Sequence, residues 1–443
     1  MTSDNVSVTT AGAMVDLKDL RADPEKYRRG AADKNVSVDF DALLDLDRRH
    51  RESLVAYETL RAEQNAASGA IGKLKDPAEK KAAVAKVGEL AGRVKAAEKA
   101  AKELSDDVTA ILLRIPQPAD SDVPVGRDAS DNVVVRHWGE KRQFDFKPKT
   151  HIELAGTLGL ADFAGGVRLA GSRSYLLTGA GAELHAAVLR FAVDRMVRDN
   201  GFTSVVVPVL VREDAMTGTG FFPAGREQAY HVGEDNLFLT GTAEVGLTAI
   251  HMNETIDESR LPLKYTAAST CFRREAGTYG KDTSGFYRVH QFDKVEQVVV
   301  CRNDVDESKR WHAEMLGYSE ALLQALNLPY RVIQCCTGDI GVKNAAMFDI
   351  ETWMPSRFDG HDDATGYGET HSASRLYEFQ ARRLNLRYKD ADGKLKFCHT
   401  LNNTVAASPR LLIPIIENYQ NADGTVTVPE VLRPYMNGRE RIG

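Results

Sequence analysis

The sequence is poor in cysteine, and its few cysteines form neither a disulfide framework nor a zinc-binding pattern. Five cysteines occur in 443 residues, and no two are spaced as a CxxC pair. No cluster of histidine and cysteine has the spacing of a zinc site. We therefore predict no zinc, and reduced, mostly buried thiols in a cytoplasmic protein. The cysteines are Cys271, Cys301, Cys335, Cys336 and Cys398.

Long apolar runs, targeting signals and excess positive charge are also missing. No apolar stretch approaches the ~18–20 residues that a membrane-spanning helix requires, so no membrane partner is expected. The first dozen residues, MTSDNVSVTTAG, contain neither an apolar core nor arginine, and we expect a loose tail there. The net charge is −6, so any surface that binds nucleic acid must be local. The phosphate-binding loops GxxxxGKS/T and GxGxxG are absent.

A long helical hairpin is predicted over about residues 39–114. Its second half has apolar residues at alternating spacings of three and four, which is typical of a coiled coil. Pro77 predicts a break between two helices of roughly 35 residues, which would give an arm about 50 Å long. Gly88 and Gly92 each cost ~1 kcal/mol relative to Ala inside a helix, and close approach of the two helices would explain them. The apolar positions are Val87, Leu90, Val94, Ala97, Ala101, Leu104, Val108 and Ile111.

The predicted tip of this arm is rich in lysine, with Lys73, Lys75, Lys80 and Lys81 close together. One interpretation is a solvated turn that serves solubility, as most charge runs do. The other is a patch that contacts phosphates far from the body. The residues themselves favour neither interpretation.

The composition changes after the proline-rich segment at residues 115–124, which predicts a linker. We place the domain boundary there, with one domain over 1–117 and another over 118–443. The second domain has a helical pattern over 183–199, an apolar strand over 204–211 and consecutive strands over 264–300. Strands that follow one another directly predict an α+β fold with a mostly antiparallel sheet.

The stretch CFRREAGTYGKDTSGFYRVHQFDKVE, residues 271–296, is the most informative in the chain. Two strand-like runs flank a loop with three glycines, which predicts a β-hairpin with a long mobile loop. Strand alternation would place the side chains of Arg273 and Glu275 on one face. The same alternation groups a second set on one face, namely Arg288, His290, Phe292, Lys294 and Glu296.

Such a face has two interpretations. A salt-bridged ladder on a solvent face would account for the charges alone. It would not account for the glycines Gly277, Gly280 and Gly285 around Lys281 and Asp282. Arginine binds phosphate or carboxylate, an aromatic ring stacks on a base, and glutamates accept hydrogen bonds from amines. Together these groups favour a site for a nucleoside triphosphate beside an amino acid.

These residues resemble motif 2 of class II seryl-tRNA synthetases of the bacterial type. GFTSVVVPVLV with MTGTGFFP resembles the dimer-forming motif 1 around Pro208, and LTGTAEVGL resembles the TxE serine loop. FQARRLNLRY and HTLNNTVAASPRLLIPIIENYQ resemble the motif 3 region. The similarity covers residues 15–436. It implies a homodimer whose arm binds the long variable arm of serine tRNA, so it assigns the lysine tip to RNA and residues 118–443 to catalysis.

The resemblance also implies an activity, which is ATP-dependent ligation of serine to serine tRNA through seryl-adenylate, with Mg²⁺. Selenocysteine tRNA, where present, would be charged in the same way. By resemblance, Arg273 contacts the α-phosphate and the serine carboxylate, and Glu275 contacts the adenine side. Phe292 would stack on adenine, and Arg288 and Arg410 would reach the γ-phosphate region. Arg273, Glu275 and Arg410 are thus the implied catalytic residues.

The implied magnesium residues are Glu369 and Ser372. For serine, the resemblance assigns the amino group to Thr242, Glu244 and Glu296, and the hydroxyl to Asn402 and Thr404. The serine carboxylate is already ionised at pH 7, so no general base is needed. We therefore expect no Ser/His/Asp or Cys/His nucleophilic arrangement.

The chain departs from the family pattern in two places. Many bacterial members read SCSNxxDFQARR where this chain reads SASRLYEFQARR, so that Arg375 replaces asparagine and Glu378 replaces aspartate. The TxE loop begins GTAE instead of PTAE. These departures leave open a specialised paralogue, either inhibitor-insensitive or dedicated to a biosynthetic pathway. Two further alternatives are a ligase that charges a carrier protein, whose relatives lack the arm, and a catalytically inactive RNA-binding dimer.

Overall fold

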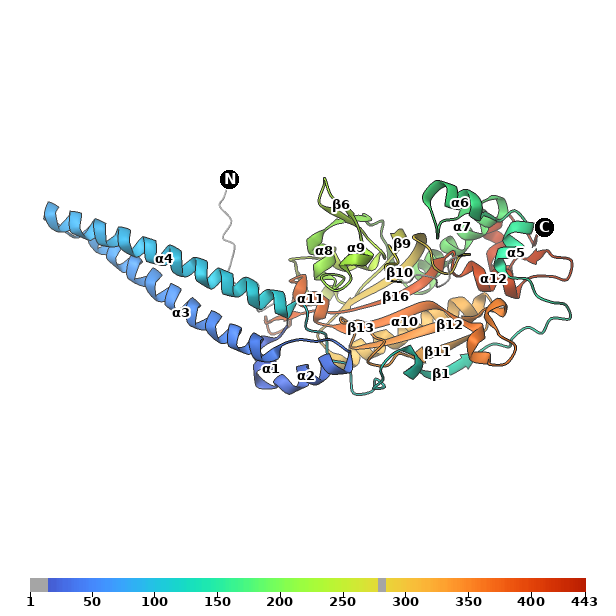
Figure 1. The fold of residues 1–443 in the computed structure, drawn as a ribbon, viewed down its shortest axis with the longest axis horizontal. Coiled ribbons are helices and arrows are strands. Elements are labelled where there is room, and N and C mark those ends of the chain that lie inside the picture. Colours follow the sequence, from blue (N-terminus) through green and yellow to red (C-terminus); the bar gives the residue numbers. More distant parts are fainter. Residues whose placement is uncertain (1–14, 278–283) are drawn as a thin grey trace. The chain divides into compact units, whose positions relative to one another are not determined.

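The chain forms two compact units, Met1–Pro116 and Gln117–Gly443, in a computed structural model (Figure 1). The structure describes residues 15–277 and 284–443. The expected N-terminal tail and the centre of the expected hairpin loop, with Gly280, Lys281 and Asp282, lie outside the described residues.

The N-terminal unit is built on the predicted helical hairpin. Its helices are α1 (Leu17–Ala22), α2 (Pro24–Asp33), α3 (Phe40–Ile71) and α4 (Pro77–Leu112). Helices α3 and α4 lie side by side along their length (Figure 1). The carboxylates of Asp39 and Asp76 cap their N-termini, and Pro77 occupies the first turn of α4, where its missing N–H costs nothing. Helix α4 packs against α3, and the residues of its predicted apolar seam are less exposed than the rest of the helix. The coiled-coil hairpin is therefore confirmed.

The two glycines of the arm do not serve close helix packing. A Cβ atom placed at Gly88 or Gly92 would meet nothing within 4 Å, so our interpretation of these glycines was wrong. Replacing each by alanine should therefore stabilise the arm by about 0.5–1 kcal/mol, because alanine lowers the backbone entropy of the unfolded chain.

Urea unfolding followed by far-UV circular dichroism measures this effect. Gly181→Ala serves as the opposite control, since its Cβ would lie 2.1 Å from the Leu160 carbonyl oxygen and should destabilise the protein. Lower stability of the Gly88→Ala and Gly92→Ala variants would show that the glycines have a role the helices do not reveal.

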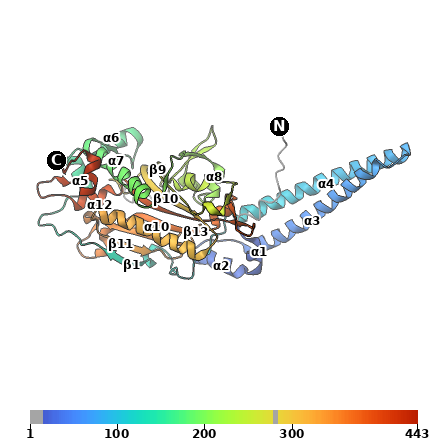
Figure 2. The ribbon, with the colours of Figure 1, turned by 180° about the vertical axis from the view of Figure 1, so that it is seen from behind.

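The C-terminal unit contains an eight-stranded sheet in the order β1-β11-β12-β13-β16-β10-β9-β4. Neighbouring strands are antiparallel except for β4 and β9, which confirms the α+β prediction. Helices α7 (Gly179–Asp194) and α10 (Val305–Ala325) pack on its central strands, and Figure 2 shows them from behind. The strands are β1 (Val133–Trp138), β4 (Thr203–Ser204), β9 (Leu263–Phe272), β10 (Gln291–Cys301), β11 (Tyr330–Gln334), β12 (Ala346–Trp353), β13 (Tyr367–Tyr377) and β16 (His399–Ser408).

Shorter elements surround this sheet. They include α8 (Glu213–Gly218), α9 (Glu244–Ala249), α11 (Phe379–Arg383), α12 (Leu412–Asn418), β5 (Leu210–Arg212), β6 (Tyr230–Val232) and β7 (Leu237–Leu239). The main hydrophobic core lies between α7, α10 and the central strands of the sheet. The pairing of β9 with β10 holds the two ends of the expected hairpin in fixed register.

The predicted strand over 204–211 is wrong, because the segment is divided between two sheets. β4 ends at Ser204 and β5 begins at Leu210. Pro208 lies between them and has no N–H to donate to a ladder. Val206 is 94% exposed, whereas Val205 and Val207 on either side of it pack against a hydrophobic cluster of the unit.

The structure also bears on the cysteines and on membrane-spanning helices. All five cysteines are buried and free, as expected. Within the part of the chain that the structure describes, no helix combines the length and the apolar character needed to cross a membrane.

Candidate active site

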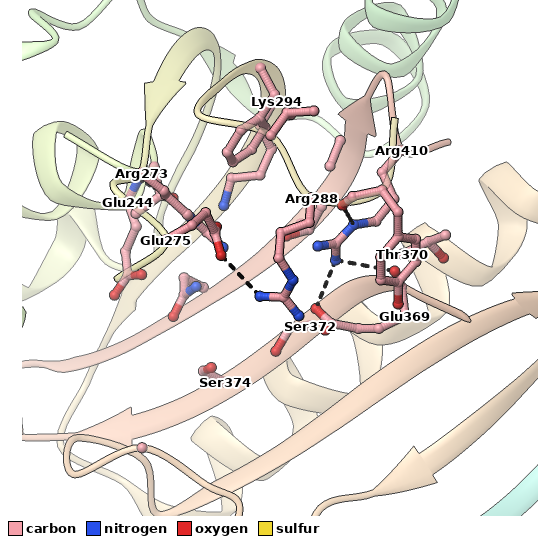
Figure 3. Close-up of a pocket in the computed structure, with 18 of the residues that line it drawn as sticks. Glu244, Arg273, Glu275, Arg288, Lys294, Glu369, Thr370, Ser372, Ser374 and Arg410 are labelled. Atoms are coloured by element: carbon pink, nitrogen blue, oxygen red, sulfur yellow. Dashed lines mark hydrogen bonds and ion pairs between the residues drawn. The ribbon is translucent and has the colours of Figure 1, made fainter. Parts of the chain in front are cut away.

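A cavity of about 250 Å³ opens over β10, β12, β13 and β16, and Figure 3 shows its charged residues. Every residue that the sequence assigned to ATP, magnesium or serine lines this cavity, except Glu296, which lies just behind it. The lining residues with assigned roles are Thr242, Glu244, Arg273, Glu275, Arg288, Phe292, Glu369, Ser372, Asn402, Thr404 and Arg410. Residues more than 160 positions apart in the chain therefore share one site.

The hairpin supplies the aromatic and cationic wall of the cavity. The Arg273 guanidinium lies 5.2 Å from the centroid of the Phe292 ring. Arg288 Nη1 donates to Glu275 Oε2 at 2.9 Å (Figure 3). His290 lies outside the cavity lining, and its Nδ1 lies 2.9 Å from the Arg273 carbonyl oxygen, so it supports the hairpin.

Strand alternation does not produce this wall, contrary to our prediction. β9 ends at Phe272 and β10 begins only at Gln291, so Arg273, Glu275 and Arg288 belong to no strand. Glu275 has φ of +52°, a left-handed conformation that is uncommon for a residue with a side chain. That turn directs the Glu275 carboxylate toward Arg288. Alternation holds only within β10, where Phe292 and Lys294 both reach the cavity.

The opposite end of the cavity combines arginine with oxygen ligands. Arg410 donates from Nε to the Tyr287 carbonyl oxygen at 3.1 Å, and its Nη1 lies 3.4 Å from Glu369 Oε1 (Figure 3). The Glu369 side chain is 45% exposed and Ser372 lies beside it on β13. Burial raises the pKa of Asp349 beneath them, and the Ser372 hydroxyl donates to that carboxyl.

This oxygen pair fits a magnesium ion. Mg²⁺ binds one or two protein oxygen ligands and completes its shell with phosphates and water. A half-exposed carboxylate beside a hydroxyl provides such a partial shell. Among residues 15–277 and 284–443 no cluster of three or more His, Cys, Asp or Glu could hold a metal ion.

Buried carboxylates border the third part of the cavity. Glu296 is fully buried and forms an ion pair with Lys294. It also accepts hydrogen bonds from Thr242 Oγ1 at 3.3 Å and from Asn402 Nδ2 at 3.0 Å. Thr404 pairs with Glu296 across β10 and β16, next to a bulge between Val295 and Glu296. Charged and hydroxyl groups thus converge where the sequence placed the amino acid.

Two lysines of this region had no role in the sequence analysis. Strand alternation places Lys294 on the correct face without giving it a function, and no sequence pattern points to Lys343. Lys343 Nζ forms an ion pair with Glu244 Oε1 and lies 4.0 Å from the centroid of the Phe221 ring. Burial lowers the pKa of Lys343, while Glu244 opposes that shift. No motif includes Lys343, so only the tertiary structure could have identified it.

The structure also contains a Ser/His/Asp arrangement, which we had not expected. His185 Nδ1 lies 2.8 Å from Ser408 Oγ, and His185 Nε2 lies 3.1 Å from Asp293 Oδ2. Ser408 is fully buried, so no substrate can reach its hydroxyl. Thr270 also donates to Asp293 at 2.7 Å. The arrangement therefore ties α7 to β10 and β16 and is not a nucleophilic centre.

The departures at Arg375 and Glu378 lie away from the cavity lining. The Arg375 side chain is 5% exposed and forms an ion pair with Asp120, which also accepts a hydrogen bond from Tyr377 Oη at 2.7 Å. Glu378 accepts from Asn303. Both substitutions thus form contacts of the scaffold, since β13 directs Ser372 and Ser374 into the cavity and Arg375 away from it.

Comparison with known proteins identifies the class of this site and then its family. Residues 230–419 match the class II tRNA synthetase core domain that is shared by the enzymes for G, H, P, S and T. Residues 14–118 match the seryl-tRNA synthetase N-terminal domain. The fold and the site therefore define a class II aminoacyl-tRNA synthetase.

Individual relatives cover nearly the whole chain. A serine–tRNA ligase of Deinococcus radiodurans is 45% identical over 97% of this chain and 99% of its own length. One of Thermobifida fusca is 44% identical over 96% and 97%. The crystal structure of a seryl-tRNA synthetase from Pyrococcus horikoshii complexed with ATP superposes with a TM-score of 0.85, at 38% identity over 97% of this chain and 99% of that one. The chain belongs to the seryl-tRNA synthetase family.

Proposed function

We propose that the protein ligates L-serine to serine tRNA in two steps. The serine carboxylate attacks the α-phosphorus of ATP, which forms seryl-adenylate and releases pyrophosphate. The terminal ribose hydroxyl of tRNA then takes the seryl group and AMP leaves. The observation that carries this proposal is that Arg273 and Phe292 line the same cavity as Thr242, which donates a hydrogen bond to the buried Glu296. Selenocysteine tRNA would be charged with serine in the same way.

The first step needs charge neutralisation more than proton transfer. The attacking carboxylate is already an anion, so the task is to hold two anionic groups together and to stabilise the developing charge. Arg273 lines the same cavity as Phe292 and Glu244, and we assign it to the α-phosphate and the serine carboxylate. Phe292 stacks on adenine, with Glu275 on the adenine side. Arg288 and Arg410 bind the departing phosphates.

Two ion pairs of the cavity would exchange partners when ATP binds. Glu275 holds Arg288, and Glu369 lies 3.4 Å from Arg410, so both arginines are kept in place by carboxylates (Figure 3). Phosphate oxygens can replace those carboxylates as acceptors. Glu369 and Ser372 would then hold Mg²⁺, which supplies positive charge to the phosphate oxygens. Preformed pairs keep the arginine side chains ordered before the substrate arrives.

Serine would bind at the buried carboxylates. We assign its amino group to Thr242, Glu244 and Glu296, and its hydroxyl to Asn402 and Thr404. A pocket that hydrogen-bonds a hydroxyl rejects an amino acid without one, because its own polar groups are left unpaired. Glu296 already accepts two hydrogen bonds and forms an ion pair with Lys294, so its position is fixed before serine enters.

Replacement of Thr404 by valine tests the assignment of the hydroxyl. The substitution keeps the shape of a side chain that is 7% exposed and removes its hydroxyl. We expect the KM for serine to rise at least ~10-fold, the cost of about one lost hydrogen bond to a buried group, with the KM for ATP nearly unchanged. Steady-state ATP–pyrophosphate exchange measures both constants. Unchanged serine kinetics would remove Thr404 from the binding set.

We propose that the N-terminal domain, taken as residues 1–117, binds tRNA through its arm, while residues 118–443 form the catalytic domain. The four tip lysines are exposed. Exposed lysines on a thin hairpin suit phosphate contacts that depend on salt.

We further propose a homodimer, supported by the exposed apolar side chains of Val206 and Leu210 in the motif 1 segment. A cytoplasmic location follows from tRNA as substrate and from free, buried thiols.

Changing the four tip lysines to glutamine should weaken tRNA binding and flatten its salt dependence. Each lost phosphate contact lowers the slope of log K against log salt by ~0.7–0.9. Filter binding of serine tRNA between low and moderate salt measures the slope. In a control variant, Lys95, Lys99 and Lys102, which lie farther along α4, are changed to glutamine. This control should alter the slope less than the tip variant does. An unchanged slope in the tip variant would contradict the RNA assignment.

Charging of tRNA tests the proposed function as a whole. Purified protein, ATP, Mg²⁺ and serine should aminoacylate serine tRNA and should leave a tRNA with a short variable arm uncharged. Release of AMP and pyrophosphate in equal amounts with seryl-tRNA would support both steps. Serine-dependent exchange without charging of any tRNA would instead favour an acceptor other than tRNA.

A further inference from the structure

Lys343 occupies a position in the amino-acid end of the cavity that the proposed roles leave unexplained. Its side chain is 14% exposed and lines the cavity together with Phe221 and Glu244. Its ammonium forms an ion pair with Glu244 Oε1, which also accepts from Gln380 Nε2 at 2.7 Å. A buried cation in a substrate pocket is costly unless it is paired, so its presence changes the charge that the pocket can accept.

The backbone that carries Lys343 is held firmly in place. The Val342 carbonyl oxygen accepts from the Gln117 N–H at 2.7 Å, and the Asn344 side chain donates to Ser374 Oγ at 2.8 Å. A Cβ atom at Gly220 would lie 3.4 Å from Lys343 Cβ, so the neighbouring loop also packs against the side chain. The backbone of Lys343 is therefore fixed, and the ammonium would lose its ion pair with Glu244 if it left the pocket.

The charges of this region balance before any substrate enters. Glu296 is paired with Lys294, and Glu244 is paired with Lys343. Arg273, near the Phe292 ring, remains for the carboxylate and phosphate of the reactants. The α-ammonium of a bound amino acid is then the single excess positive charge at the two carboxylates. A second ammonium on the amino-acid side chain would place four cations around two anions.

We propose that Lys343 is a specificity-determining residue that excludes amino acids with a cationic side chain and admits small neutral ones. This inference rests on the proposed function, because it concerns the amino-acid subsite of the same cavity. The sharpest competitor is L-2,3-diaminopropionate, which has the heavy-atom skeleton of serine with an amine in place of the hydroxyl. Repulsion between like charges a few ångströms apart in a protein changes binding by roughly 30-fold or more. Shape alone cannot separate these two amino acids.

The test compares ATP–pyrophosphate exchange with serine, diaminopropionate, alanine and cysteine in the wild type and three variants. Lys343→Met removes the charge and keeps the length, Lys343→Gln keeps a hydrogen-bond donor to Glu244, and Lys343→Arg keeps the charge. We expect the ratio of kcat/KM for diaminopropionate to that for serine to rise at least ~10-fold in the Met and Gln variants, because Glu244 is then free to accept the second ammonium. The Arg variant should keep the ratio of the wild type.

Alanine and cysteine are the controls for a merely structural role. A loosened pocket would raise activity with all three analogues, whereas loss of a specific charge raises it with diaminopropionate alone. The inference is overturned if the ratio stays constant in both neutral variants, or if it rises only as much as the ratio for alanine. Absence of serine-dependent exchange in the wild type would instead remove the proposed function, so the two failures can be told apart.

Discussion

Replacing Arg273 by glutamine should lower serine-dependent ATP–pyrophosphate exchange by about 10³-fold or more, with little loss of stability. Removing one preorganised donor from a developing charge commonly costs ~10²–10³ in rate, and Arg273 is assigned to two anionic groups at once. Its guanidinium lies in the cavity, 5.2 Å from the Phe292 ring, and donates a long hydrogen bond of 3.4 Å from Nε to the Gly241 carbonyl oxygen. The fold therefore depends little on this side chain.

Arg274 provides a matched control for this prediction. It is the next residue in the chain, it is exposed, and it does not line the cavity. Arg274→Gln should keep exchange within about twofold of the wild type, since exposed substitutions of this kind have small effects. Arg273→Lys should recover little, because an ammonium cannot bind two oxygens in the planar geometry of a guanidinium. Near-normal exchange in Arg273→Gln would contradict the assigned role.

Shortening the arm should separate the two steps of the reaction. Replacing residues 57–92 with a short glycine–asparagine turn removes the lysine tip and keeps the apolar cluster at the base of the hairpin, with Leu43, Val108 and Leu112. We expect tRNA charging to fall at least ~100-fold, because several phosphate contacts are lost together. Serine-dependent exchange should stay within about twofold, since the cavity lies wholly within the other unit.

Two measurements make this result decisive. Exchange and charging are assayed on the same preparation, and circular dichroism verifies that the shortened hairpin is still helical. Loss of exchange in a folded, shortened protein would contradict the division of labour between the domains. Normal charging would show that the arm does not contact tRNA.

Features determined by local patterns were predicted correctly from the sequence. The seam of α4 needs only the spacing of apolar residues, and Pro77 marks the start of that helix. The antiparallel arrangement of β9 and β10 follows from two strand patterns close together in the chain. The residues of the cavity came from the family resemblance, and the structure brings them together. Their individual roles remain proposals.

Features that depend on distant residues could not be read from the sequence. Glu244 and Lys343 are separated by 99 positions, so no local sequence pattern predicts their ion pair. The same holds for Ser408 and His185, 223 positions apart, whose contact we had not expected. The left-handed turn at Glu275 broke the strand alternation that we had assumed. Each case reflects tertiary packing that overrides or adds to local preference.

The most direct test of the central claim is amino-acid-dependent ATP–pyrophosphate exchange on the purified protein. Serine, threonine, alanine, glycine and cysteine are assayed in parallel, with Arg273→Gln as the inactive reference. Our account predicts strong exchange with serine and much weaker exchange with each of the others. Absence of exchange with all five, from a folded protein, would contradict it and would favour an RNA-binding protein without catalytic activity.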